Sequence, residues 1–247
     1  MGRPLGQHFL YQRPILERIA VAVCPEREPL CIEIGPGLGV LTECLLERCD
    51  RLVAVELDPL LAGSLRARYE LDPRFSLIEA DILDADLSGF GPAVVCGNIP
   101  YYITSPIIEK ALSLGPNLVR AVFLIQKEVA DRLIAEPGSK DYGYLTVCTQ
   151  VACRVEKLFG VKPNAFRPPP KVDSAVVRLT PHDKPLAPPA FLKFVSACFQ
   201  HKRKTLRNNL AARYGHQIAD ALPHGGRRAE EMSIEQLLEV YRGLTGA

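Results

Sequence analysis

Short apolar runs alternate with amphipathic segments through the first half of the chain, and this alternation constrains the fold most. The apolar runs are typical of strands buried on both faces, and lie at residues 30–34, 52–55, 75–78, 93–96 and 119–125. Helix-like segments occur at residues 15–23, 38–46, 60–69, 104–114 and 129–134. The pattern predicts an α/β fold, a doubly wound parallel sheet with helices on both faces.

The second half of the chain has a different pattern. Residues 144–152 are helix-like, while residues 155–161 and 171–179 are strand-like and predicted to pair as a hairpin. Residues 181–189 contain four prolines and predict a linker. Beyond it, helices are predicted over residues 191–210, near 217–222 and over 234–244. We therefore predict a sheet domain over residues 1–182 and a small all-helical domain over residues 183–247.

The composition indicates a soluble protein. Apolar residues make up 47% of the sequence, which is ample for a core, and no apolar run approaches the roughly 18 residues needed to cross a bilayer. The first eight residues lack the apolar stretch of a secretory signal. The eight cysteines form no Cys-x-x-Cys pair and have no histidine cluster beside them, which favours reduced thiols over disulfides or metal ligands. We expect a cytoplasmic protein with no membrane segment and no metal.

Charge is unevenly distributed, although the net charge is only +2. Residues 33–86 include twelve acidic and five basic residues, whereas residues 184–219 include seven basic residues and no acidic one. This asymmetry predicts that the C-terminal part meets a polyanion, with a solvated basic helix face as the alternative interpretation. The candidate phosphate ligands lie on a predicted basic helix and are Lys202, Arg203, Lys204 and Arg207.

A glycine-rich turn joins the first predicted strand to the next helix. Residues 33–39 have the sequence Glu-Ile-Gly-Pro-Gly-Leu-Gly, which differs from the Gly-x-Gly-x-x-Gly of dinucleotide-binding folds. Gly35 and Gly37 allow the backbone to approach a ligand, and the following helix offers free N–H groups. Glu33 would repel a pyrophosphate but suits a cationic amino-acid group. The turn therefore favours S-adenosyl-methionine over a nicotinamide cofactor, and a plain strand-to-helix turn is the alternative.

Two further carboxylates close the next two strands. Glu56 ends the second strand, where a carboxylate can accept hydrogen bonds from both hydroxyls of a ribose. Asp81 follows the third strand and can accept from an adenine amino group, while Ile82 packs on the ring. Each acid alone is more often a solvated strand end. At successive strand ends beside the glycine turn, they predict a nucleoside site.

The fourth strand is followed by Asn-Ile-Pro-Tyr-Tyr at residues 98–102. The Asn98 side-chain oxygen and a backbone carbonyl, at Ile99 or Pro100, can accept hydrogen bonds from an exocyclic adenine amino group. These bonds would align the nitrogen with a methyl donor, so that catalysis is mainly positioning and desolvation. Tyr101 would stack on the base, and Phe166 is a candidate second stacking ring. The alternatives are an Asx turn at Asn98 and a core position for Phe166.

Longer motifs accompany the glycine turn and the Asn-Ile-Pro-Tyr turn. They are residues 5–10 (Leu-Gly-Gln-His-Phe-Leu), 166–176 (Phe-Arg-Pro-Pro-Pro-Lys-Val-Asp-Ser-Ala-Val) and 199–210 (Phe-Gln-His-Lys-Arg-Lys-Thr-Leu-Arg-Asn-Asn-Leu). Together with residues 33–39 and 98–101, Glu56 and Asp81, these segments resemble the ribosomal RNA adenine dimethyltransferases, most closely the type that acts on the small-subunit rRNA. The combination is highly specific and extends through most of the chain.

This resemblance implies a class I S-adenosyl-methionine-dependent methyltransferase, with a seven-stranded, mostly parallel, Rossmann-like sheet and a helical C-terminal domain. It implies dimethylation of two adjacent adenosines at N6 in the 3′-terminal hairpin of 16S rRNA, during small-subunit biogenesis, by a monomer. It also implies that His8 and Leu10 fold over the cofactor, with the remaining cofactor contacts at Gly35, Glu56, Asp81 and Asn98.

Three other functions are compatible with parts of the sequence. Enzymes that methylate 23S rRNA share the Asn-x-Pro-Tyr turn, but residues 168–175 and 202–208 favour the 16S type. A factor that binds RNA without turnover would be expected to have degenerate cofactor or Asn-Ile-Pro-Tyr residues, and the sequence has neither. A nicotinamide-dependent reductase disagrees with the glycine spacing and with Glu33.

Overall fold

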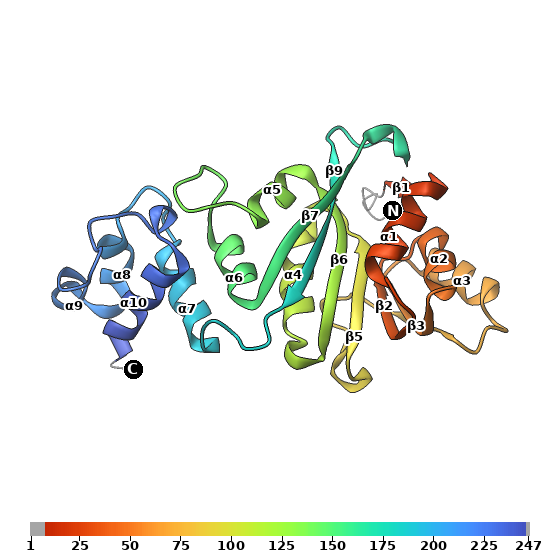
Figure 1. Cartoon of the computed structure of the whole chain (residues 1–247), viewed down its shortest axis with the longest axis horizontal. Coiled ribbons are helices and arrows are strands. Elements are labelled where there is room, and N and C mark those ends of the chain that lie inside the picture. The colour runs from red at the N-terminus through yellow and green to blue at the C-terminus, as the bar shows by residue number, and fades with distance from the viewer. Residues whose placement is uncertain (1–7, 246–247) are drawn as a thin grey trace. The chain divides into compact units, whose positions relative to one another are not determined.

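Seven strands form one sheet in the computed structural model, which describes residues 8–245 (Figure 1). The strand order is β4-β3-β2-β5-β6-β9-β7. The strands are β2 (Glu28–Ile34), β3 (Cys49–Glu56), β4 (Phe75–Glu79), β5 (Ala93–Asn98), β6 (Leu118–Gln126), β7 (Cys153–Val161) and β9 (Ser174–Pro181). Neighbours from β4 to β6 pair in parallel, and β9 pairs antiparallel with β6. The mostly parallel sheet is confirmed, and the two segments predicted as a hairpin are neighbouring strands, β7 and β9.

The strand order reverses at β2, and this reversal places the ligand site. The chain runs outward from β2 to β3 and β4, then returns to form β5 on the other side of β2. In such sheets a crevice opens at the carboxyl ends of the strands beside the reversal. Glu33, Glu56 and Asn98 lie at or next to the carboxyl ends of β2, β3 and β5.

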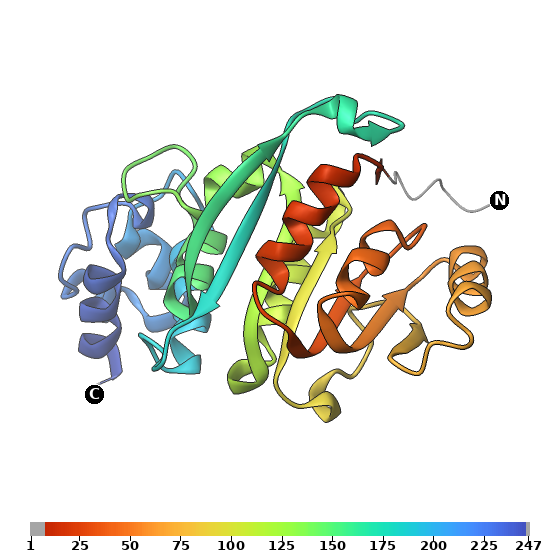
Figure 2. The same cartoon turned by 45° about the vertical axis from the view of Figure 1, so that its right-hand side comes forward.

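Five α-helices of the first half of the described chain accompany the sheet, and the first of them shows how an apolar face packs against it. They are α1 (Arg13–Val23), α2 (Val40–Leu46), α3 (Pro59–Arg68), α4 (Thr104–Leu112) and α5 (Lys127–Leu133). The buried stripe of α1, at Leu16, Ile19, Ala20 and Val23, packs in one core with residues of β2, β5 and β6. Figure 2 shows α1 lying along β5 and β6. The predicted helices of this half are confirmed, with ends that differ by a few residues.

A two-stranded sheet joins the start of the described chain to the segment after β7. Strand β1 (Phe9–Leu10) pairs antiparallel with β8 (Phe166–Arg167), so that Phe9 lies opposite Arg167 and Leu10 opposite Phe166. Tyr11 N also donates to the Ala165 carbonyl at 3.1 Å. These bonds fix the backbone around His8.

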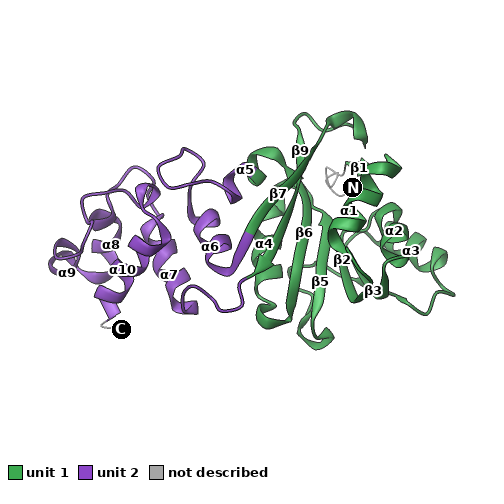
Figure 3. Ribbon diagram, viewed as in Figure 1, with its two compact units in different colours: residues 1–130, 155–181 green, residues 131–154, 182–247 purple. Residues whose placement is uncertain are grey.

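The chain divides into two compact units (Figure 3). The first is Met1–Ala130 with Val155–Pro181, and the second is Asp131–Arg154 with His182–Ala247. The sequence-based boundary at residues 182/183 therefore differs from this division, because residues 131–154 join the helical unit. The reason is packing: Val147 and Val151 of α6 (Tyr144–Ala152) share a core with Phe191 and Phe194.

The long helix predicted over residues 191–210 is wrong. Two helices occupy this region, α7 (Pro189–Cys198) and α8 (Leu206–Tyr214), followed by α9 (His216–Asp220) and α10 (Ile234–Thr245). Buried Asn209 stabilises the break, since its Nδ2 donates to the carbonyls of Cys198 (2.9 Å) and His201 (3.2 Å). Its Oδ1 accepts from His201 N at 3.1 Å, and Thr205 caps α8.

The predicted basic helix is consequently a turn. Lys202, Arg203 and Lys204 lie in the non-helical residues 199–205, here called the basic turn, and Arg207 alone of the four lies on α8. The sequence missed the break because residues 199–205 contain no proline or glycine.

The sequence also predicted reduced cysteine thiols and no membrane segment. All eight cysteines are buried and none forms a disulfide. Within residues 8–245 no helix is long and apolar enough to span a bilayer.

Candidate active site

A pocket in the first unit brings together almost all the predicted catalytic and cofactor-binding residues. It lies at the carboxyl ends of β2, β3 and β5, and its lining includes Asn98, Pro100 and Tyr101. The predicted cofactor residues in the lining are His8, Leu10, Glu33, Gly35, Gly37, Glu56, Asp81, Ile82 and Asn98.

The glycine turn leaves room for a ligand. Gly35, Gly37 and Gly39 have φ of +64°, +58° and +73°, a region that side chains rarely adopt. A Cβ added at Gly35 would meet no heavy atom within 4 Å, whereas one at Gly37 would come within 2.9 Å of the Phe9 ring. Gly35 therefore borders open space in the pocket, which fits a ligand lying directly against the backbone.

Two buried carboxylates flank this turn. Glu33 is 1% exposed and accepts a hydrogen bond from Thr42 Oγ1 at 2.6 Å. Burial raises the pKa of Glu33 to about 7, with the Thr42 hydrogen bond opposing the shift and the Glu56 charge adding to it. Glu56 accepts from the backbone N–H groups of Gly37 and Asp58, both at 3.0 Å. Each oxygen of Glu56 keeps a lone pair for a ligand hydroxyl.

Asp81 has a looser environment than the two glutamates. It is half-buried, and its Oδ1 accepts from Leu83 N at 2.9 Å. The bond fixes the carboxylate and leaves Oδ2 as an acceptor. Ile82 beside it is buried and also lines the pocket.

Asn98 is held in one orientation by the start of the described chain. Its Nδ2 donates to the His8 carbonyl at 2.8 Å, which leaves Oδ1 as the acceptor at the pocket. The Pro100 carbonyl already accepts from Ile103 N (3.2 Å) and Thr104 Oγ1 (3.3 Å). Of the two backbone acceptors proposed from the sequence, the Ile99 carbonyl is therefore favoured.

The Tyr101 ring is also fixed. Its hydroxyl is 2.7 Å from Ser174 Oγ, and burial raises its pKa, so it stays neutral. The centroids of the Tyr101 and His8 rings are 5.7 Å apart, and His8 Nδ1 lies 2.8 Å from the Pro168 carbonyl oxygen. A half-buried aromatic ring beside an amide oxygen can bind a planar amino-bearing base.

The family model described as "Ribosomal RNA adenine dimethylase" matches residues 2–245. The chain belongs to this family. A curated relative from Acidobacterium capsulatum, "Ribosomal RNA small subunit methyltransferase A", is 43% identical over 97% of this chain and 90% of its own length. A protein of the same name from Chlorobium chlorochromatii is 41% identical, over 97% of this chain and 92% of its own.

Solved structures agree with this assignment to the adenine dimethylase family. A dimethyladenosine transferase from Plasmodium falciparum superposes with a TM-score of 0.83 at 26% identity, over 97% of this chain and 98% of its own. The 23S rRNA methyltransferase ErmE gives 0.73 at 31% identity, over 96% and 99%. The fold is that of the class I methyltransferases, with a helical C-terminal region, as the sequence predicted.

One predicted catalytic residue, Phe166, lies outside the lining of this pocket. Phe166 is 2% exposed and packs in the core with Leu10, Val161 and Ala165, and it is not among the described residues lining the pocket. Pairing of β8 with β1 directs the ring into the core. Phe166 therefore occupies a core position in this structure, which favours the core alternative, and its stacking role stays a prediction.

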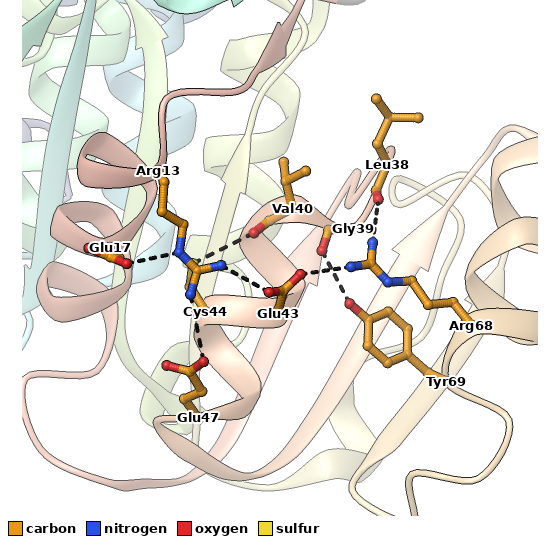
Figure 4. A network of polar contacts seen from close by, with 10 residues as sticks. All are labelled: Arg13, Glu17, Leu38, Gly39, Val40, Glu43, Cys44, Glu47, Arg68 and Tyr69. Carbon is orange, nitrogen blue, oxygen red and sulfur yellow. Dashed lines mark hydrogen bonds and ion pairs between the residues drawn. The ribbon is translucent and has the colours of Figure 1, made fainter.

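A polar network behind the glycine turn was missed by sequence reasoning (Figure 4). Arg68 donates to the Leu38 carbonyl at 3.2 Å and to Glu43 at 2.7 Å. The Tyr69 hydroxyl donates to the Gly39 carbonyl at 3.2 Å. Glu43 also pairs with Arg13 at 3.0 Å, which links α1, α2 and α3. Arg68 and Tyr69 thus hold the turn from outside the pocket, and no motif in the sequence marks them.

Proposed function

We propose that this protein transfers methyl groups from S-adenosyl-methionine to N6 of two adjacent adenosines in the 3′-terminal hairpin of 16S rRNA. The observation that carries the proposal is the fixed Asn98 amide beside Tyr101, in the same pocket as the glycine turn and its carboxylates. The 16S rather than 23S target is supported by the comparisons. Small-subunit enzymes are 41–43% identical to this chain, against 31% for ErmE.

The pocket residues suit the parts of the cofactor. Glu56 would accept from the ribose hydroxyls, Asp81 from the adenine amino group, and Glu33 would face the ammonium of the methionine moiety. Gly35 would lie against the cofactor without a side chain between them. When bound, the cofactor supplies an electrophilic methyl group.

The remaining residues position the target. The Asn98 Oδ1 and the Ile99 carbonyl would accept the two amino hydrogens of adenine and direct the nitrogen lone pair. Tyr101 would stack on the base after it leaves its helix. No strong base is required, because the methylated ammonium is acidic enough to lose a proton to water. Most of the rate enhancement therefore comes from alignment and exclusion of water.

The basic turn is the proposed phosphate-binding surface of the helical unit. The three candidate cations of the turn and Arg207 on α8 differ in environment. Lys202 Nζ donates to the Lys140 carbonyl at 3.1 Å, and Arg207 Nε is 3.5 Å from Asp220. Arg203 and Lys204 are exposed, and neither side chain forms a hydrogen bond or ion pair with another described residue. We infer that Arg203 and Lys204 contribute most to RNA binding.

Replacing Arg203 and Lys204 together by glutamine is expected to weaken binding to small ribosomal subunits and to lower the salt slope by about 2, one per lost phosphate contact. Binding should be measured from 50 to 200 mM salt. The control is Lys184→Gln with Lys193→Gln, which removes the same charge from the same unit. Equal slopes for the two double variants would show that only net charge matters.

Replacing Arg68 by methionine and Tyr69 by phenylalanine is expected to weaken S-adenosyl-methionine binding about tenfold, because the glycine turn loses two outer hydrogen bonds. The rate at saturating cofactor should change little, and calorimetry with steady-state kinetics separates the two quantities. Arg66→Met is the matched control, since Arg66 lies on the same helix and pairs with Glu79 at 3.0 Å away from the turn. An equal loss in the control would contradict a role for the turn.

The function as a whole is tested by mapping methylated adenosines. Unmethylated small subunits and large subunits are incubated with the protein and labelled S-adenosyl-methionine, and both rRNAs are read by primer extension. We expect label at two adjacent adenosines near the 3′ end of 16S rRNA. Label in 23S rRNA would support the alternative target, and absence of label would contradict the proposal. We also infer that the protein acts as a cytoplasmic monomer.

A further inference from the structure

Tyr102 is an aromatic residue of the pocket that the proposed mechanism leaves unused. It lines the pocket, yet its side chain is 62% exposed. Among the aromatic side chains of the described pocket lining, it is the most exposed: Phe9, Tyr101 and His8 are all half-buried. A ring that is both exposed and part of a pocket lining is accessible to a bound ligand, and tyrosine is enriched at such contact surfaces.

The backbone explains why two consecutive tyrosines have different environments. Residues Tyr101–Ile103 form a 3₁₀ turn, in which successive side chains diverge by about 120°. Hydrogen bonds from Ile103 N and Thr104 Oγ1 to the Pro100 carbonyl hold this turn. Tyr101 is directed inward to Ser174, and Tyr102 consequently lies at the rim.

We propose that Tyr102 stacks on the base of the nucleotide next to the target adenosine. The proposal rests on the proposed function, since it assumes an adenosine against Tyr101. A nucleotide taken out of its helix leaves its chain neighbour without a stacking partner on one side. Tyr102 follows Tyr101 directly in the chain, and single-stranded nucleic acids bind such rings through successive bases.

Tyr102 is better placed than Phe166 to stack on this neighbouring base. Phe166, the other ring predicted for a base, is buried in the core at 2% exposure. The exposed Tyr102 hydroxyl forms no hydrogen bond with another described residue, so the fold does not depend on this hydroxyl. For a substrate with two adjacent adenosines, Tyr102 would hold one base while Tyr101 holds the other.

The test compares Tyr102→Ala, Tyr102→Phe and Tyr102→Trp with the wild type on unmethylated small subunits. Loss of the stack in Tyr102→Ala should raise KM for subunits about tenfold and leave the Kd for S-adenosyl-methionine within about twofold. Tyr102→Phe and Tyr102→Trp should restore KM, because the ring and not the hydroxyl acts. Leu71→Ala is the control, since Leu71 is 93% exposed and lies outside the pocket lining.

A second readout locates the stacked base. Subunits are reconstituted with 2-aminopurine beside the target adenosine, and its fluorescence should fall on binding the wild type but not Tyr102→Ala. An unchanged KM in Tyr102→Ala, or a phenylalanine variant as impaired as alanine, would overturn the proposal. A weakened cofactor Kd would assign Tyr102 to the cofactor instead and also overturn it. A wild-type protein that methylates no adenosine contradicts the proposed function itself, which is a distinct result.

Discussion

Replacing Asn98 by alanine is expected to lower the rate of methyl transfer about a thousandfold at saturating substrates. The variant loses the Oδ1 acceptor that would orient the adenine amino group, and one preorganised polar contact of this kind is worth about a hundredfold to a thousandfold. It also loses the 2.8 Å hydrogen bond to the His8 carbonyl, so cofactor binding should weaken a few-fold as well. Binding to small subunits should be spared, because the basic turn belongs to the other unit.

Single-turnover rates with preformed subunit complexes would measure this effect separately from affinity. Asn117→Ala is a suitable control, since Asn117 lies in the short turn before β6, outside the pocket lining. An Asn98→Ala rate above a tenth of the wild type would show that Asn98 is not the main amino-group acceptor. A variant that loses subunit binding would instead point to a structural role.

Replacing Glu33 by glutamine is expected to stabilise the ligand-free protein at alkaline pH and to weaken cofactor binding at least tenfold. Burial raises the pKa of Glu33 from 4.5 to about 7 in the folded state. Between these values the folded protein binds more protons than the unfolded chain, so its stability falls as pH rises through this range. Above pH 8 the ionised carboxylate costs on the order of 3 kcal/mol, which glutamine removes. The expected gain in Tm at pH 8 is about 5 °C or more.

The same carboxylate should couple cofactor binding to proton release. Near pH 6 Glu33 is mostly protonated in the free protein, and a cofactor ammonium beside it would favour its ionisation. Calorimetry in buffers of different ionisation enthalpy should therefore detect up to one released proton in the wild type and none in Glu33→Gln. Glu26→Gln is the control, since Glu26 is exposed. Equal proton release by Glu33→Gln and Glu26→Gln would contradict the proposal that Glu33 ionises beside the cofactor ammonium.

The sequence predicted the sheet and the pocket because both depend on local patterns. Apolar runs identified the strands of the parallel sheet, and Glu33, Glu56 and Asn98 lie at or beside strand ends that the fold gathers at one edge. Phe166 could not be placed this way, because its environment depends on the pairing of β8 with β1, far apart in the chain. The break between α7 and α8 depends on buried Asn209 binding several backbone groups at once, a tertiary effect without a local signal.

The division of the chain into two units also limits which segments recombination between related genes can exchange. Two separate segments, Asp131–Arg154 and His182–Ala247, form the second unit, so the backbone passes between the units three times. A single recombination event near residue 182 would transfer α7 to α10 but leave behind α6, whose Val147 and Val151 belong to their core. A functional exchange of the helical unit between relatives would need both segments together. The helical unit is therefore expected to be inherited together with the first unit and to change by substitution of single residues.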